Sequence, residues 1–224
     1  MAARPPTDLI VGSLFLGLLT SVFWPLTQHV ITMAHEGSHA TVGSMTGGTV
    51  KHVKLYANGD GVTRVPGNSP LLTGFVGYVG PSVFGILGAW ILAYGVPPDA
   101  IIWVSVAMFV VLFFQVRNVF CWLAVLSFGS LFYLVGRYGT PGGRTVFVYT
   151  WVWFLLFGGF LHTAIDNVKM AGLRFWSSDA AALRDIYKLP RGFWGMLWWL
   201  ATLAALVYGG GILLGVIHPP LGHR

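Results

Sequence analysis

The chain has 224 residues, of which 55% are hydrophobic and 9% are charged, and its formal net charge is +6. A soluble domain carries about 25% charged residues, so this composition excludes an ordinary water-soluble enzyme. It predicts an all-α polytopic membrane protein, in which excess Lys and Arg report orientation in the bilayer and not nucleic-acid binding. The single cysteine, Cys121, excludes an internal disulfide.

The first apolar segment runs from Leu9 to Trp24 and continues beyond Pro25 to a polar end that contains His35. From Leu9 to His35 a helix would extend about 39 Å, which exceeds the bilayer core of about 30 Å. The segment is therefore either one tilted span kinked at Pro25 or two shorter pieces that meet there. We favour the single kinked span.

A His-Glu-x-x-His sequence ends this segment at residues 35–39 and contains the only Glu of the chain, Glu36. Residues four apart share a helix face, so His35 and His39 can bind one metal ion. Glu36 would lie beside that ion, where a general base for a metal-bound water is needed. A catalytic zinc site also requires a third protein ligand. The simpler alternative is a polar helix end with two histidines facing a loop.

Residues 49–65 follow a Gly-Gly helix stop and are rich in β-branched residues around Asn58-Gly59. This pattern predicts a short β-hairpin after the first span, with a surface loop as the alternative. Later, Ser178 precedes residues 179–183 in a pattern typical of a capped short helix on the surface.

Apolar segments predict about six transmembrane helices within a single membrane-embedded domain, residues 1–224, without a separate soluble domain. After the first span they cover residues 71–94, 101–114, 119–134, 145–167 and 193–217. The second of the six is rich in glycine and contains Gly80-Pro81, which indicates either tight helix packing or a shaped cleft wall.

Basic residues are distributed unevenly between the two sides of this topology. Nine Lys and Arg follow spans one, three and five, against four on the other side. The positive-inside rule therefore places the ends of spans one and five in or near the cytoplasm. His35 and His39 would then reach the same membrane depth as His162 and Asp166, and facing helices can assemble a metal site in this way.

Asp166 is the expected third ligand, because a carboxylate at that depth needs a partner. His162, one turn earlier, is an alternative ligand or a donor that orients Asp166. Asp179 is a further candidate ligand, although a carboxylate at a helix start is also favoured by the helix dipole. Asn118 and Asn167 are candidates for donating a hydrogen bond to the oxyanion of a reaction intermediate.

These motifs resemble the site-2 protease family of intramembrane zinc metalloproteases, and in particular its small bacterial, B-like branch. The resemblance rests on His-Glu-x-x-His-Ala at residues 35–40, the Gly-Gly turn, the hairpin and the Gly-Pro of the second span. It implies Zn²⁺, His35 and His39 as ligands, Glu36 as the base, and an aspartate ligand from a later span. That aspartate commonly stands in a Leu-Asp-Gly or Asn-Pro-Asp-Gly setting; neither occurs in this chain, and Ile165-Asp166-Asn167 is the nearest substitute.

The sequence thus predicts an intramembrane zinc metalloendopeptidase of the bacterial plasma membrane, with its active site near the cytoplasmic side. Its partners would be the lipid bilayer and a membrane protein substrate whose membrane-embedded helix is cut. One alternative is an inactive family member that serves as a partner or scaffold subunit in a membrane complex, which the missing aspartate setting favours. The other is a metal or small-solute transporter, against which the single Glu directly after the first ligand argues.

Overall fold

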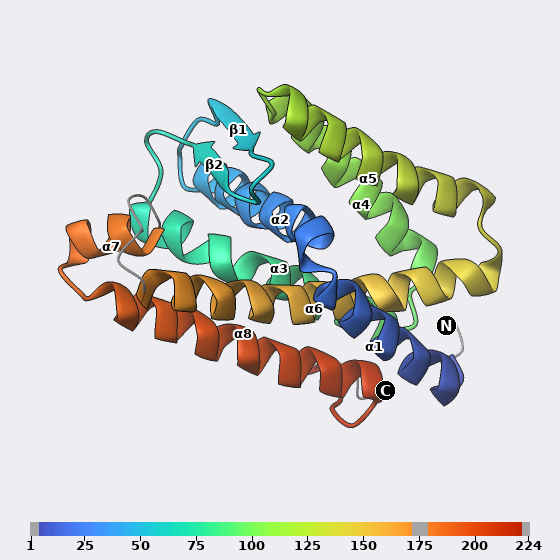
Figure 1. The fold of residues 1–224 in the computed structure, drawn as a ribbon. Coiled ribbons are helices and arrows are strands. Elements are labelled where there is room, and N and C mark those ends of the chain that lie inside the picture. The colour runs from blue at the N-terminus through green and yellow to red at the C-terminus, as the bar shows by residue number, and fades with distance from the viewer. Residues whose placement is uncertain (1–4, 172–178, 221–224) are drawn as a thin grey trace.

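The computed structural model describes residues 5–171 and 179–220, which form a bundle of helices with one small hairpin (Figure 1). In chain order, the elements in these residues are α1 (Thr7–Val22), α2 (Trp24–Met45), β1 (His52–Leu55), β2 (Gly61–Arg64), α3 (Pro70–Ala93), α4 (Pro98–Gln115), α5 (Val119–Tyr138), α6 (Pro141–Ala171), α7 (Asp179–Tyr187) and α8 (Arg191–Leu214). The short helix expected after Ser178 is α7, while Ser178 itself lies outside the described residues.

Five helices of the described chain, α3, α4, α5, α6 and α8, are long and apolar enough to cross a membrane. The pair α1 and α2 gives a sixth span if it is counted as one broken span. The predicted all-α polytopic architecture with about six spans and a hairpin is therefore confirmed, and the protein is an integral membrane protein.

The first predicted span is broken more sharply than expected. α1 and α2 are separate helices that meet at Phe23 with a bend of 98°, so the favoured single kinked span is replaced by two shorter pieces. Pro25 lies in the first turn of α2, the part of a helix where a missing N–H costs nothing. The Thr27 hydroxyl donates to the Thr20 carbonyl across the corner, at 2.9 Å. This bond ties the first turn of α2 to the end of α1 and so holds the corner.

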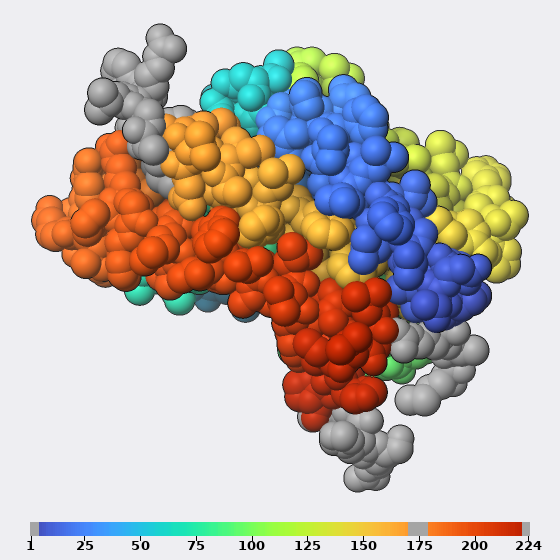
Figure 2. Space-filling view, turned by 60° about the horizontal axis from the view of Figure 1, so that its bottom comes forward, coloured from blue at the N-terminus to red at the C-terminus, as the bar shows by residue number. Residues whose placement is uncertain are grey.

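α3 is the central helix of the bundle and packs against α2, α6 and α8 (Figure 1). Its glycines allow this close approach: a Cβ on Gly85 would lie 2.8 Å from Leu156, and one on Gly88 would lie 2.7 Å from Val152. Both partners belong to α6, which reaches the surface between α2 and α8 on the face shown in Figure 2. At Gly85 and Gly88, the glycine pattern of the second predicted span thus reflects tight helix packing.

The hairpin is confirmed, with β1 and β2 antiparallel and Val53 opposite Thr63. Gly59 occupies its turn with φ of +91°, a conformation that favours glycine. Two hydrogen bonds fix the hairpin against α2. Thr32 of α2 donates to the Gly59 carbonyl at 2.8 Å, and Thr63 of β2 donates to the Glu36 carbonyl at 3.1 Å. The hairpin therefore lies directly over the His-Glu-x-x-His segment.

The outer edge of β1 is covered by the segment between α4 and α5. Val116 forms a parallel bridge with Val53, and the Arg117 N–H donates to the Val53 carbonyl at 3.0 Å. The Asn118 amide donates to the Leu55 carbonyl at 2.6 Å and accepts from the Leu55 N–H at 3.3 Å. Within the described residues, β1 is the only strand that pairs with β2, so the outer edge of β2 has no strand beside it.

Candidate metal centre

α2 presents the two histidines and the glutamate of the His-Glu-x-x-His sequence as buried side chains. His35, Glu36 and His39 are 7%, 4% and 6% exposed. The helical spacing brings the Nε2 atoms of His35 and His39 within 2.9 Å of each other. His39 Nδ1 lies 2.7 Å from the Thr73 carbonyl, to which it can only donate, so this contact leaves the Nε2 lone pair available to a metal ion.

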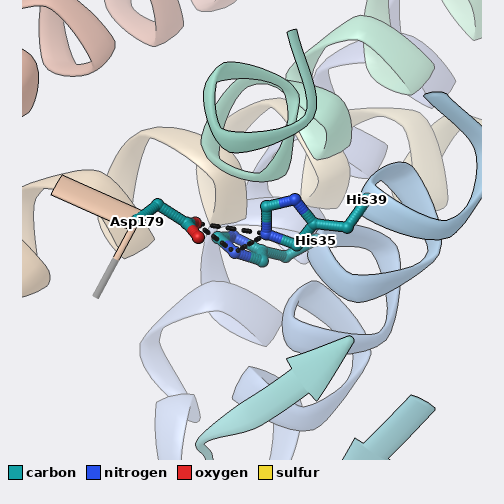
Figure 3. Close-up of side chains that lie close together, drawn as sticks. All are labelled: His35, His39 and Asp179. Carbon is teal, nitrogen blue, oxygen red and sulfur yellow. Dashed lines mark hydrogen bonds and ion pairs between the residues drawn. The ribbon is translucent and has the colours of Figure 1, made fainter. Parts of the chain in front are cut away.

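The third group at this position comes from α7 and is Asp179. Its Oδ2 lies 3.1 Å from Nε2 of both His35 and His39, and its side chain points at the ends of the two rings (Figure 3). Asp179 opens α7, whose next residues, Ala180 and Leu183, are buried against the rest of the bundle. A docked apolar face of α7 therefore carries the carboxylate to the two imidazoles.

The charge state of Asp179 suits a ligand. Burial raises the pKa of its carboxyl, but the neighbouring His39 and His35 lower it by more, so the pKa lies well below its ordinary value. A carboxylate must be ionised to bind a metal ion, and here it would be ionised at neutral pH.

The donor set of His35, His39 and Asp179 fits a zinc ion. One ligand atom from each lies within 4.8 Å of the others. Ligands about 2.0–2.1 Å from a tetrahedral zinc ion lie ~3.3 Å apart, close to the separations found here. The helix that faces the two rings carries a glycine, Gly77 of α3, at the point of contact. Any larger residue at this position would collide with both imidazole rings through its Cβ.

Glu36 lies next to this group without belonging to it. Its Oε2 is buried and has no hydrogen-bond partner among the described residues. A Cβ on Gly61 of β2 would collide with the Glu36 carboxylate, so the glycine makes room for that side chain. The carboxylate therefore has an oxygen available to accept a proton beside the metal-binding group.

A cavity of about 690 Å³ opens over these side chains. It is bounded by α2, the hairpin, α3, the end of α6 and α7. Its lining includes the two histidines, Glu36 and Asp179, together with residues 61–63 of β2. The cavity therefore lies against β2, beside the candidate metal centre.

Asp166 was expected to complete the metal centre, and the structure places it elsewhere on the cavity wall. Its carboxylate accepts a hydrogen bond from the Tyr78 hydroxyl at 3.0 Å and lies 3.3 Å from His162 Nε2 and 3.2 Å from Lys169 Nζ. A carboxylate at this depth does need partners, as the sequence argument held, but three side chains supply them. Asp179 takes the position next to His35 and His39.

His162 lies in the cavity wall too, with its ring centroid 5.3 Å from that of His35. The two candidate oxyanion donors are outside the cavity lining. Asn118 covers the edge of β1, and Asn167 donates to the Gly195 carbonyl at 3.0 Å, which ties α6 to α8. Two residues of α3 that contact the histidines were not predicted from the sequence: Thr73, which accepts from His39, and Tyr78, whose ring packs against His35. Their only signal in the sequence was a hydroxyl and an aromatic side chain within a glycine-rich span.

Fold and site together define a polytopic membrane protein with a group of two buried histidines and one half-buried aspartate beside a buried glutamate. The chain matches the family described as Peptidase M50B-like over residues 9–209, which is most of its length. It therefore belongs to this family of membrane metalloproteases, and the resemblance to the site-2 protease family is confirmed. Comparisons with curated proteins and with solved structures gave no significant match.

Proposed function

We propose that the protein is an intramembrane zinc metalloendopeptidase that hydrolyses a peptide bond in a membrane-embedded substrate. The observation that carries the proposal is the convergence of His35, His39 and Asp179 beside Glu36 in one cavity. Two imidazoles and one carboxylate are the ligand set of catalytic zinc sites that keep one position open. The proposed ligands are thus His35, His39 and Asp179, with Asp179 in place of Asp166.

Each residue has a defined part in this proposal. A zinc ion bound here would polarise the scissile carbonyl and make a water molecule acidic enough to lose a proton near neutral pH. Glu36 would accept that proton on Oε2, which has no other partner among the described residues, and pass it to the leaving amine. The Thr63 hydroxyl holds the backbone at Glu36 and so helps to fix the base.

The substrate would enter the cavity as an extended segment along β2. Backbone groups on the outer edge of β2 can pair with another extended chain, as in other cases of peptide recognition by strand addition. The covered edge of β1 leaves β2 as the open edge of the described hairpin, and β2 lines the cavity beside Glu36. A substrate helix would have to unwind there before its carbonyl could be attacked.

An inactive scaffold is less well supported than an enzyme. The usual sequence setting of the aspartate ligand is missing, but Asp179 supplies a carboxylate at 3.1 Å from both histidines. Glu36, the proposed general base, lines the same cavity as these residues.

Zinc analysis and a cleavage assay test the proposed function together. The purified protein should carry one zinc ion per chain and cut at least one of a set of single-span membrane peptides in reconstituted vesicles. Chelation should stop cleavage, and added Zn²⁺ should restore it. A protein that binds no zinc contradicts the proposed metal centre, and a zinc-loaded protein that cuts none of the peptides favours the scaffold.

We further propose that the hairpin and the metal centre lie near the cytoplasmic side of the membrane. The loops at their end of the bundle hold most of the Lys and Arg of the chain, and such loops tend to face the cytoplasm. A cysteine placed at the exposed Asn58 in the hairpin turn should react with a membrane-impermeant thiol reagent only from the cytoplasmic side. Cys121, the single native cysteine, is buried and should give little background. Labelling from the outside would show the opposite orientation.

A further inference from the structure

The two histidines of the metal centre are held in different ways. His39 is oriented by a hydrogen bond from Nδ1 to the Thr73 carbonyl. His35 has no such bond: its Nδ1 is buried and has no hydrogen-bond partner among the described residues. The direction in which His35 Nε2 points must therefore be fixed by the groups packed around its ring.

Two rings from other helices pack against His35 on the cavity side. Tyr78 of α3 meets it edge-on, with centroids 4.7 Å apart and planes at 85°. His162 of α6 lies with its centroid 5.3 Å away and its plane at 42°. The two rings are also 5.5 Å from each other, so the three form one cluster.

One carboxylate connects these two rings. Oδ2 of Asp166 accepts a hydrogen bond from the Tyr78 hydroxyl at 3.0 Å and lies 3.3 Å from His162 Nε2. Lys169 Nζ is 3.2 Å from the other oxygen, Oδ1. The Asp166 side chain is 14% exposed, and burial strengthens such contacts.

We propose that Asp166 is a positioning residue of the metal centre. Through Tyr78 and His162 it would keep the His35 imidazole turned so that Nε2 faces Asp179 and His39. The inference rests on the proposed function, because it assumes that these three residues bind the metal ion. Asp166 itself touches neither the ion nor the substrate in this role.

Zinc affinity, measured by competition with a chelator, tests this role without relying on activity. Asp166→Ala should weaken zinc binding about 10- to 100-fold, the usual cost of losing a partner that orients a ligand. It should still bind one ion at saturating zinc, and the absorption spectrum with Co²⁺ should show a distorted site with the same ligand types. Asp166→Asn, which keeps an acceptor oxygen, should recover most of the affinity.

Tyr78→Phe provides an independent arm that keeps the ring and removes only the hydroxyl. It should weaken zinc binding less than Asp166→Ala, and the double variant should bind zinc like Asp166→Ala alone, because both changes break one chain of contacts. Asp99→Ala is the matched control. It removes a carboxylate from an ion pair with Arg144, outside the cavity, and should leave zinc affinity unchanged.

Three results would overturn the inference: an Asp166→Ala protein with the affinity of the parent, additive losses in the double variant, or complete loss of stoichiometric zinc in Asp166→Ala. The last would make Asp166 a ligand. A parent protein that binds no zinc would instead overturn the proposed function itself, so the two failures are distinguishable. If Asp166→Ala does not fold, Tyr78→Phe still decides, since an unchanged zinc affinity there contradicts the inference.

Discussion

Glu36→Gln should lower the rate of peptide cleavage by about 10²- to 10⁴-fold, the typical contribution of a general base. Its zinc content should stay at one ion per chain. The reason is that Glu36 lies beside the group of His35, His39 and Asp179 but is not part of it. The amide keeps the size of the side chain and cannot accept the proton. Cleavage of a reconstituted substrate and metal analysis of the same sample measure both effects.

The control for this variant is Asp185→Asn, which also replaces an acid by its amide. Asp185 lies on α7 at the surface, where it pairs with Arg184. Its cleavage rate should equal that of the parent. Cleavage at the parent rate by Glu36→Gln contradicts the proposed mechanism. Loss of zinc from Glu36→Gln would instead make Glu36 a ligand.

Asp179→Ala should lose its zinc under mild chelation. The expected drop in affinity exceeds the ~100-fold that removal of a ligand-orienting partner can cost, because a direct ligand is removed. The carboxylate lies 3.1 Å from Nε2 of both His35 and His39. Among the described residues, no other acid forms a metal-binding group with them. Chelator competition measures the change, and cleavage should disappear with the metal ion.

Asp185→Ala, on the same short helix, controls for disturbance of α7 and should keep parental zinc affinity. An Asp179→Ala protein that holds zinc as tightly as the parent would show that Asp179 is not a ligand. Asp166 and His162, the two candidates on α6, would then have to be tested in its place.

Features determined by neighbouring residues could be predicted from the sequence. The spacing of His35 and His39 places them on one helix face, and Asn58-Gly59 gives the turn that the hairpin needs. Pro25 indicated a discontinuity in the first span. It did not indicate the 98° bend, because the angle depends on what α1 and α2 pack against.

The third member of the metal-binding group could not be predicted with the same argument. Membrane depth placed Asp166 near the two histidines, and it does line the same cavity. What brings Asp179 closer is the docking of α7 on the bundle through Ala180 and Leu183, a contact between distant parts of the chain. A helix-start carboxylate has an ordinary local explanation, so the sequence alone did not distinguish it from a ligand.

The use of Asn118 shows the same limit. A side-chain amide can donate to an oxyanion or to any exposed backbone carbonyl, and only the fold decides which is near. Here the amide bonds both backbone groups of Leu55, so that β1 is closed off on its outer side.

The ligands of the proposed metal centre are widely separated along the chain: His39 and Asp179 are 140 residues apart. An ion bound to both would act as a removable cross-link between α2 and α7. By thermodynamic linkage, free zinc at 100 times its dissociation constant would raise the free energy of unfolding by about 2.7 kcal/mol. The melting temperature of the purified protein would then rise with zinc concentration, and heat resistance could report metal occupancy even before any substrate is known.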